Sequence, residues 1–193
     1  LGSTDFVLLT FVIALLDSLC CGFLIASGWL LSKKAWGGYL TGGIYALYPV
    51  AIFYATTPLI APLAAFFLSG FILFTLWQCD KLTLWRTLIL GIFAGLIAIH
   101  RLNLAPMVGL YSLILLMLSI SWRERIIHGT LFGLVTLFII APFTYMNYQN
   151  SGGDFILIAK TGATELYMGN NRDSPGRHSN TFAYQNIDMA YDK

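Results

Sequence analysis

The spacing of apolar residues constrains this chain more than any other feature. Runs of seventeen or more apolar residues recur along the sequence, and about twenty such residues let a helix cross the hydrocarbon core of a bilayer. Only 10% of the residues are charged, whereas a soluble domain carries roughly a quarter. The pattern predicts an all-α polytopic membrane protein with about six transmembrane helices, near residues 6–31, 39–55, 59–77, 82–99, 104–121 and 126–145.

Residues 146–193 have a different composition, because they are polar and rich in Asn, Gly and Tyr. We expect them to form an extracytoplasmic loop or the start of a soluble segment, after a transmembrane region covering 1–145. Phe155–Ile158 is typical of a short strand because it follows the turn residues Gly152, Gly153 and Asp154. Leu166–Met168 has a similar pattern and is a second candidate strand.

Six of the eleven basic residues fall in short loops that are separated by pairs of predicted spans. Because successive loops alternate sides, these basic loops share one side, which the positive-inside rule makes cytoplasmic. The break around Arg101 and everything after Pro142 are then outside, so the C-terminal segment is extracytoplasmic. The net charge of +2 is too small to predict a nucleic-acid partner. The six basic loop residues are Lys33, Lys34, Lys81, Arg86, Arg123 and Arg125.

A polar break, Ile99–Pro106, separates two apolar runs. The run before it, Thr87–Ile99, would reach roughly 20 Å as a helix, against a hydrocarbon core near 30 Å. The break is therefore expected at or below the membrane surface, where an arginine must face protein, water or an anion. Two interpretations follow: a hairpin tip at which Arg101 and His100 touch lipid phosphates nonspecifically, or an anion site for a lipid-linked phosphate.

Asp17 is the one carboxylate deep in any predicted span. An acid in hydrocarbon is a functional candidate by default, because its ionised form is costly there unless it is paired or hydrated. The alternative, which we favour, is a neutral or water-bridged Asp17 that Ser18 caps against a neighbouring helix.

The cysteines and histidines do not predict a metal site. Cys20 and Cys21 are adjacent and Cys79 is distant, a spacing that fits neither a disulfide framework nor zinc. His100, His128 and His178 are scattered over both predicted sides, and His128 is expected only to decorate the cytoplasmic face.

Four stretches together resemble the GT-C glycosyltransferases of the dolichyl-phosphate-mannose protein mannosyltransferase type, a superfamily that includes bacterial enzymes of envelope glycans. The first is YALYPVAIFY, and the second is the break GIFAGLIAIHRLN. The third is the end of the last span, APFTYMNY, and the fourth is the outer loop that contains LYMGNN. They occupy residues 45–54, 91–103, 141–148 and 155–176, and their order and spacing follow the family's pattern.

This resemblance implies a hexosyl- or pentosyl-transferase in a bacterial inner or plasma membrane. The enzyme would move a sugar from a polyprenyl-phosphate donor to a glycan, lipid or protein acceptor outside, by inverting displacement. Arg101 is carried over to the donor phosphate, because a guanidinium stays charged and offers two parallel donors. His100 and Asn103 are neighbours that would add hydrogen bonds. The outer-loop candidates are Gly169, Asn170 and Asn171.

The chain departs from the family at three places. The family's key acid lies in an outer loop after a helix that would precede Phe6, so we expect the general base upstream of Leu1 and this chain to be a fragment. The alternative is a divergent member of the family. Ala61 stands where an acid often precedes a proline, and Met146 stands where the family has an arginine. No cofactor is predicted, and the sequence leaves the use of a divalent cation open.

The competing interpretation is a small polytopic transporter or a non-catalytic membrane scaffold. A transporter is expected to repeat an interrupted span in its two halves, and the sequence indicates one such break.

Overall fold

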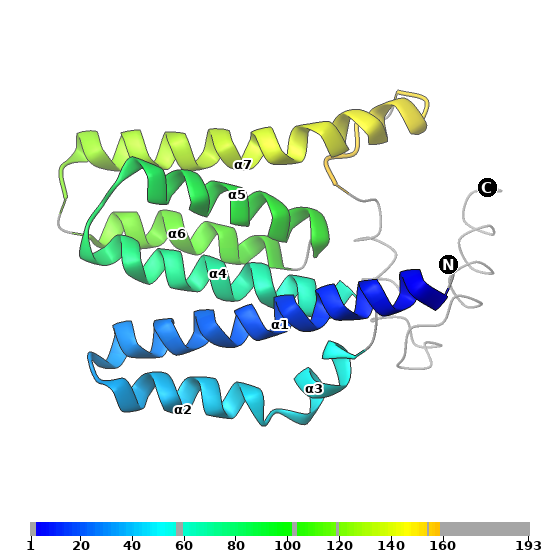
Figure 1. Ribbon diagram of the computed structural model, residues 1–193. Coiled ribbons are helices and arrows are strands. Elements are labelled where there is room, and N and C mark those ends of the chain that lie inside the picture. Colours follow the sequence, from blue (N-terminus) through cyan, green and yellow to red (C-terminus); the bar gives the residue numbers. More distant parts are fainter. Residues whose placement is uncertain (1–2, 57–59, 102–103, 119, 154, 159–193) are drawn as a thin grey trace, which may run out of the picture. The chain divides into compact units, whose positions relative to one another are not determined.

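The computed structural model describes residues 3–56, 60–101, 104–118, 120–153 and 155–158, and the secondary structure of this part is helical (Figure 1). The chain divides into two compact units, Leu1–Phe143 and Thr144–Lys193. The helices of the described part are α1 (Ser3–Ser32), α2 (Ala35–Ala46), α3 (Pro49–Ala55), α4 (Ile60–Asp80), α5 (Leu84–His100), α6 (Ala105–Met117) and α7 (Trp122–Asn150).

Within the described residues, three helices are long and apolar enough to cross a membrane: Val7–Ser32, Ala61–Asp80 and Trp122–Asn150. Leu84–His100 is a shorter apolar helix. Many large apolar side chains on these helices are exposed, among them Phe11 and Phe138. Exposed apolar surface on this scale suits lipid and not water, so the chain is a membrane protein. The number of six spans stays a prediction.

Glycines bring α1 and α2 close together. A Cβ at Gly42 would collide with the Ile25 side chain, and one at Gly37 would collide with Ser32. The close approach lets Thr41 Oγ1 donate to the Leu24 carbonyl oxygen of α1 at 3.0 Å. Small residues at a helix interface have this use inside membranes, where van der Waals contact and interhelical hydrogen bonds drive helix association.

The predicted span 39–55 is interrupted. Helix α2 ends at Ala46, and α3 begins at Pro49 after an extended Tyr48 (ψ 112°). Proline has no N–H to continue the helical ladder, and its ring disfavours a helical conformation in the residue before it. Where the sequence predicted one continuous span, the structure therefore has two helices.

Helices α4 to α7 share the larger core. Phe71, Leu90, Tyr111 and Phe132 pack there, one from each of the four helices. Helix α5 approaches α7 closely, because a Cβ at Gly91 would lie 2.7 Å from the Cβ of Val135. All four helices also supply one side chain each to the buried polar cluster described below.

Helix α6 is shorter than the predicted span 104–121, because it ends at Met117 after 13 residues. At 1.5 Å per residue it reaches roughly 20 Å, which is less than the hydrocarbon core. Helix α7 is longer than predicted, because it continues through Pro142 to Asn150.

The predicted strand at Phe155–Ile158 is wrong, because these four residues adopt no strand. Side chains of α7 take the hydrogen bonds that a partner strand would supply. Thr144 Oγ1 donates to the Leu157 carbonyl oxygen at 2.6 Å, and Asn147 Nδ2 donates to that of Ile158 at 2.8 Å. The preceding turn is as expected, with Gly152 and Gly153 at positive φ (72° and 105°). The candidate strand Leu166–Met168 lies outside the described residues.

Candidate functional site

The candidate anion site lies at the C-terminal end of α5. His100 is the last residue of the helix, and its ring stacks on that of Phe67 from α4 with centroids 5.4 Å apart. Arg101 leaves the helix in an extended conformation (φ −145°, ψ 96°). Its backbone N–H still donates to the Ile97 carbonyl oxygen at 2.8 Å, and its own carbonyl oxygen accepts from Leu104 N–H at 2.9 Å. The backbone of Arg101 is therefore held on both sides.

The side chain of Arg101, in contrast, is exposed. Among the described residues its guanidinium has no hydrogen-bond or ion-pair partner. An arginine whose backbone is fixed and whose guanidinium has no protein partner among the described residues can bind a negatively charged ligand without first losing a protein contact. The other predicted site residues, Asn103, Gly169, Asn170 and Asn171, lie outside the described residues.

Two arginines at the opposite end of the bundle are engaged by the protein itself. Arg86 Nη1 donates to the Trp77 and Lys81 carbonyl oxygens at 2.6 and 3.0 Å. Its guanidinium carbon also lies 4.2 Å from the centroid of the Trp77 ring, within the range of a cation–π contact. Arg125 Nη2 donates to the Leu118 carbonyl oxygen at 2.7 Å, and its guanidinium carbon lies 4.9 Å from the Trp122 ring centroid. These contacts hold both arginines in place.

A buried polar cluster lies at this same end, and we call Gln78, Thr87, Tyr111 and His128 the four-helix cluster. One residue comes from each of α4, α5, α6 and α7, and all four are buried. Thr87 Oγ1 is the centre of the cluster. It accepts from Gln78 Nε2 at 2.8 Å, lies 3.3 Å from Tyr111 Oη and lies 2.5 Å from His128 Nδ1.

The hydrogen bonds of Gln78 fix which way its side-chain amide group points. Gln78 Oε1 accepts from Thr83 N–H at 3.4 Å, which aims the amide nitrogen at Thr87. Thr87 has one hydroxyl proton to donate, and the acceptors within its reach include the close His128 Nδ1 and, at 3.3 Å, the Thr83 carbonyl oxygen. The direction of the bond between Thr87 and His128 depends on the tautomer of the imidazole.

The prediction that His128 only decorates the surface is wrong, because this side chain is 6% exposed and bonded across helices. Sequence reasoning also missed Gln78, Thr87 and Tyr111. For Gln78 and Thr87 the one signal was polarity beside a predicted basic loop, which is equally typical of solvated residues, and Tyr111 lies inside the predicted span 104–121.

Asp17 has a partner on the next helix. Tyr45 Oη donates to Asp17 Oδ1 at 2.5 Å, joining the middle of α1 to the last turn of α2. The expectation that Ser18 caps Asp17 is wrong, because Ser18 Oγ donates to the Ala14 carbonyl oxygen of its own helix at 2.8 Å. Of the favoured interpretation, the contact with a neighbouring helix is observed, through Tyr45, and a neutral or water-bridged Asp17 stays a prediction.

Metal ligands do not gather in the part of the chain that the structure describes: no three His, Cys, Asp or Glu side chains there could hold an ion together. Comparison with known proteins adds no relative, since no family model, no curated protein and no solved structure matches this chain.

Proposed function

We propose that the protein is a membrane glycosyltransferase that moves a sugar from a polyprenyl-phosphate donor to an acceptor on the extracytoplasmic face. One observation supports this proposal most: Arg101 is exposed at the end of α5 and lacks a protein partner among the described residues. Arg86 and Arg125, at the other end, are bound to carbonyl oxygens and tryptophan rings. Of these three arginines, Arg101 is the one available to a ligand.

The reaction would form a bond from the acceptor oxygen to the anomeric carbon while the bond from that carbon to the phosphate oxygen breaks. The acceptor proton passes to a base, and the polyprenyl phosphate leaves with the bonding electrons. Negative charge grows on the phosphate during this step, so a guanidinium positioned there stabilises the transition state more than the ground state. In the proposal this is the role of Arg101, with His100, held by Phe67, as its neighbour.

The test is sugar transfer by the full-length protein in native membranes, with polyprenyl-phosphate mannose as the first donor. We expect Arg101→Ala to lower the rate of transfer by about 10²-fold or more and Arg101→Lys to restore part of it. The matched control is Lys33→Gln, which removes a cation already paired with Asp80 and should leave transfer unchanged. Transfer that is undiminished in Arg101→Ala membranes containing normal amounts of protein would contradict the proposal.

A transporter is the second candidate, and one structural feature favours it. The break between α2 and α3 adds a second interrupted segment to the one after α5, and each new helix has proline in its first turn. Paired interruptions are typical of transporters. Uptake or efflux without any sugar transfer by the full-length protein would favour this function over the first.

A further inference from the structure

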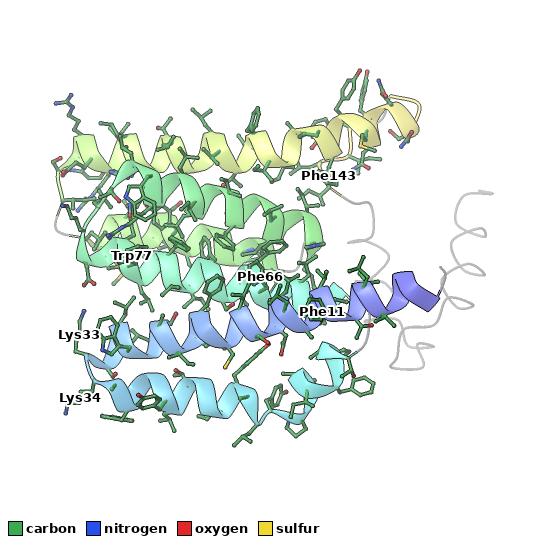
Figure 2. The ribbon with its side chains drawn as sticks, in the orientation of Figure 1. Phe11, Lys33, Lys34, Phe66, Trp77 and Phe143 are labelled. Carbon is green, nitrogen blue, oxygen red and sulfur yellow. The ribbon has the colours of Figure 1, made fainter. Side chains whose placement is uncertain are left out.

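The basic end of the unit Leu1–Phe143 collects cations from three separate connections. Lys33 Nζ lies 3.3 Å from Asp80 Oδ1, which joins the α1–α2 connection to the α4–α5 connection. The hydrogen bond between Thr87 and His128 brings the start of α7 to the start of α5. Figure 1 shows these three connections at the same end, and Figure 2 labels Lys33, Lys34 and Trp77 there. Six cations thus share this end with two carboxylates, Asp80 and Glu124.

Both carboxylates are already engaged. Asp80 pairs with Lys33, and Glu124 accepts hydrogen bonds from the Ser121 N–H and hydroxyl at 3.0 and 2.8 Å. Arg86 and Arg125 are bound to carbonyl oxygens, as described above. The cations that remain are Lys34, Lys81 and Arg123. Lys34 and Lys81 lie in connections and Arg123 lies in the first turn of α7; all three are exposed and have no side-chain partner among the described residues.

Tryptophans mark the same end. All five tryptophans of the chain lie within four residues of one of the six cations. Every one of them is exposed, from 37% for Trp77 to 69% for Trp122. Tryptophan is enriched where a membrane protein crosses the headgroup layer, because its ring is apolar and its N–H is a donor. The three free cations are therefore set at headgroup depth. The five are Trp29, Trp36, Trp77, Trp85 and Trp122.

We propose that Lys34, Lys81 and Arg123 form a docking surface for the headgroups of anionic phospholipids. The charge excess of this end complements the negative surface of an anionic leaflet, and the tryptophan belt holds the cations at the level of the lipid phosphates. This inference is independent of the proposed function, because it concerns the opposite end of α5 from Arg101.

The experiment places the full-length protein in bilayer nanodiscs of phosphatidylcholine with and without phosphatidylglycerol. Native mass spectrometry then counts the phosphatidylglycerol molecules that stay bound after mild delipidation, and titration gives their affinity. We expect each of Lys34→Gln, Lys81→Gln and Arg123→Gln to weaken phosphatidylglycerol binding about fivefold, with the triple variant weakest. The single variants keep the test valid if the triple variant does not fold.

The matched control is Lys33→Gln. It also removes one positive charge, but that charge is already paired with Asp80. We expect it to retain phosphatidylglycerol as the wild type does. Equal retention by the wild type and all three single variants would overturn the proposal. A loss in Lys33→Gln as large as that in Lys34→Gln would also overturn it, because net charge and not the three free cations would then control binding.

Discussion

The two ends of α5 use arginine in opposite ways. Near its start, Arg86 is bound by two carbonyl oxygens and a tryptophan ring, beside a buried cluster that joins four helices. Just past the end of α5, the backbone of Arg101 is held by hydrogen bonds, and its exposed guanidinium has no partner among the described residues. The same residue type stabilises the fold at one end and stays available for a ligand at the other. Substitution of Arg86 should therefore change stability, and substitution of Arg101 should change function.

The largest expected effect is at the centre of the four-helix cluster. Thr87→Val keeps the shape of the side chain but removes the oxygen that Gln78, Tyr111 and His128 share. Buried polar groups left without a partner are costly, so we expect the free energy of unfolding to fall by about 2 kcal/mol. Unfolding by SDS in mixed micelles measures this change.

Thr75→Val is the matched control for that experiment. Thr75 is also buried, but its hydroxyl donates to the Phe71 carbonyl oxygen of its own helix at 2.7 Å. A Thr87→Val loss no larger than the Thr75→Val loss would mean that the cluster does not join the helices as a unit.

A smaller effect is expected for the bound arginine. Arg86→Gln loses the contact with the Trp77 ring and the charge of its hydrogen bonds to two carbonyl oxygens, so we expect a loss of about 1 kcal/mol in the same assay. Arg101→Gln, its partner in the comparison, should leave the unfolding free energy unchanged. If the two variants lose stability equally, the contrast between the two ends is wrong.

The smallest effect is expected for the ion pair between Lys33 and Asp80. Its side chains are 69% and 51% exposed, and exposed pairs contribute between about 0.2 and 1 kcal/mol. Asp80→Asn should therefore lower the unfolding free energy by less than about 1 kcal/mol, and added salt should reduce this loss because it screens the pair in the wild type. A larger loss that salt does not change would indicate that Asp80 has another role.

Features of the fold that depend on neighbouring residues in the sequence could be predicted, and contacts between helices could not. The membrane class was predicted because it follows from runs of apolar residues. The break before Pro49 is an exception: it was not predicted, because residues 39–55 read as one apolar span. The partner of Asp17 did not follow, because Tyr45 reaches it only through the rotation and register of two packed helices. His128 was misplaced for the same reason: its burial and its bond to Thr87 depend on how α7 packs against α5, which no local pattern encodes.

The candidate site was predicted less completely than the fold. The polar break predicted a charged Arg101 at the end of a helix. The structure adds that its guanidinium has no partner among the described residues. The strand at Phe155–Ile158 was predicted from β-forming residues after a turn. A strand also needs a neighbour to bond with, and here Thr144 and Asn147 of the preceding helix supply those bonds.

The hydrogen bond between Tyr45 and Asp17 has a consequence for how the chain is made. Tyr45 lies 28 positions after Asp17, so at 5–20 residues per second Asp17 is synthesised roughly one to six seconds before its partner. During that interval α1 carries a polar group that lipid cannot satisfy. We therefore expect α1 to wait beside the insertion machinery until α2 follows, so that the two helices enter the bilayer as one hairpin.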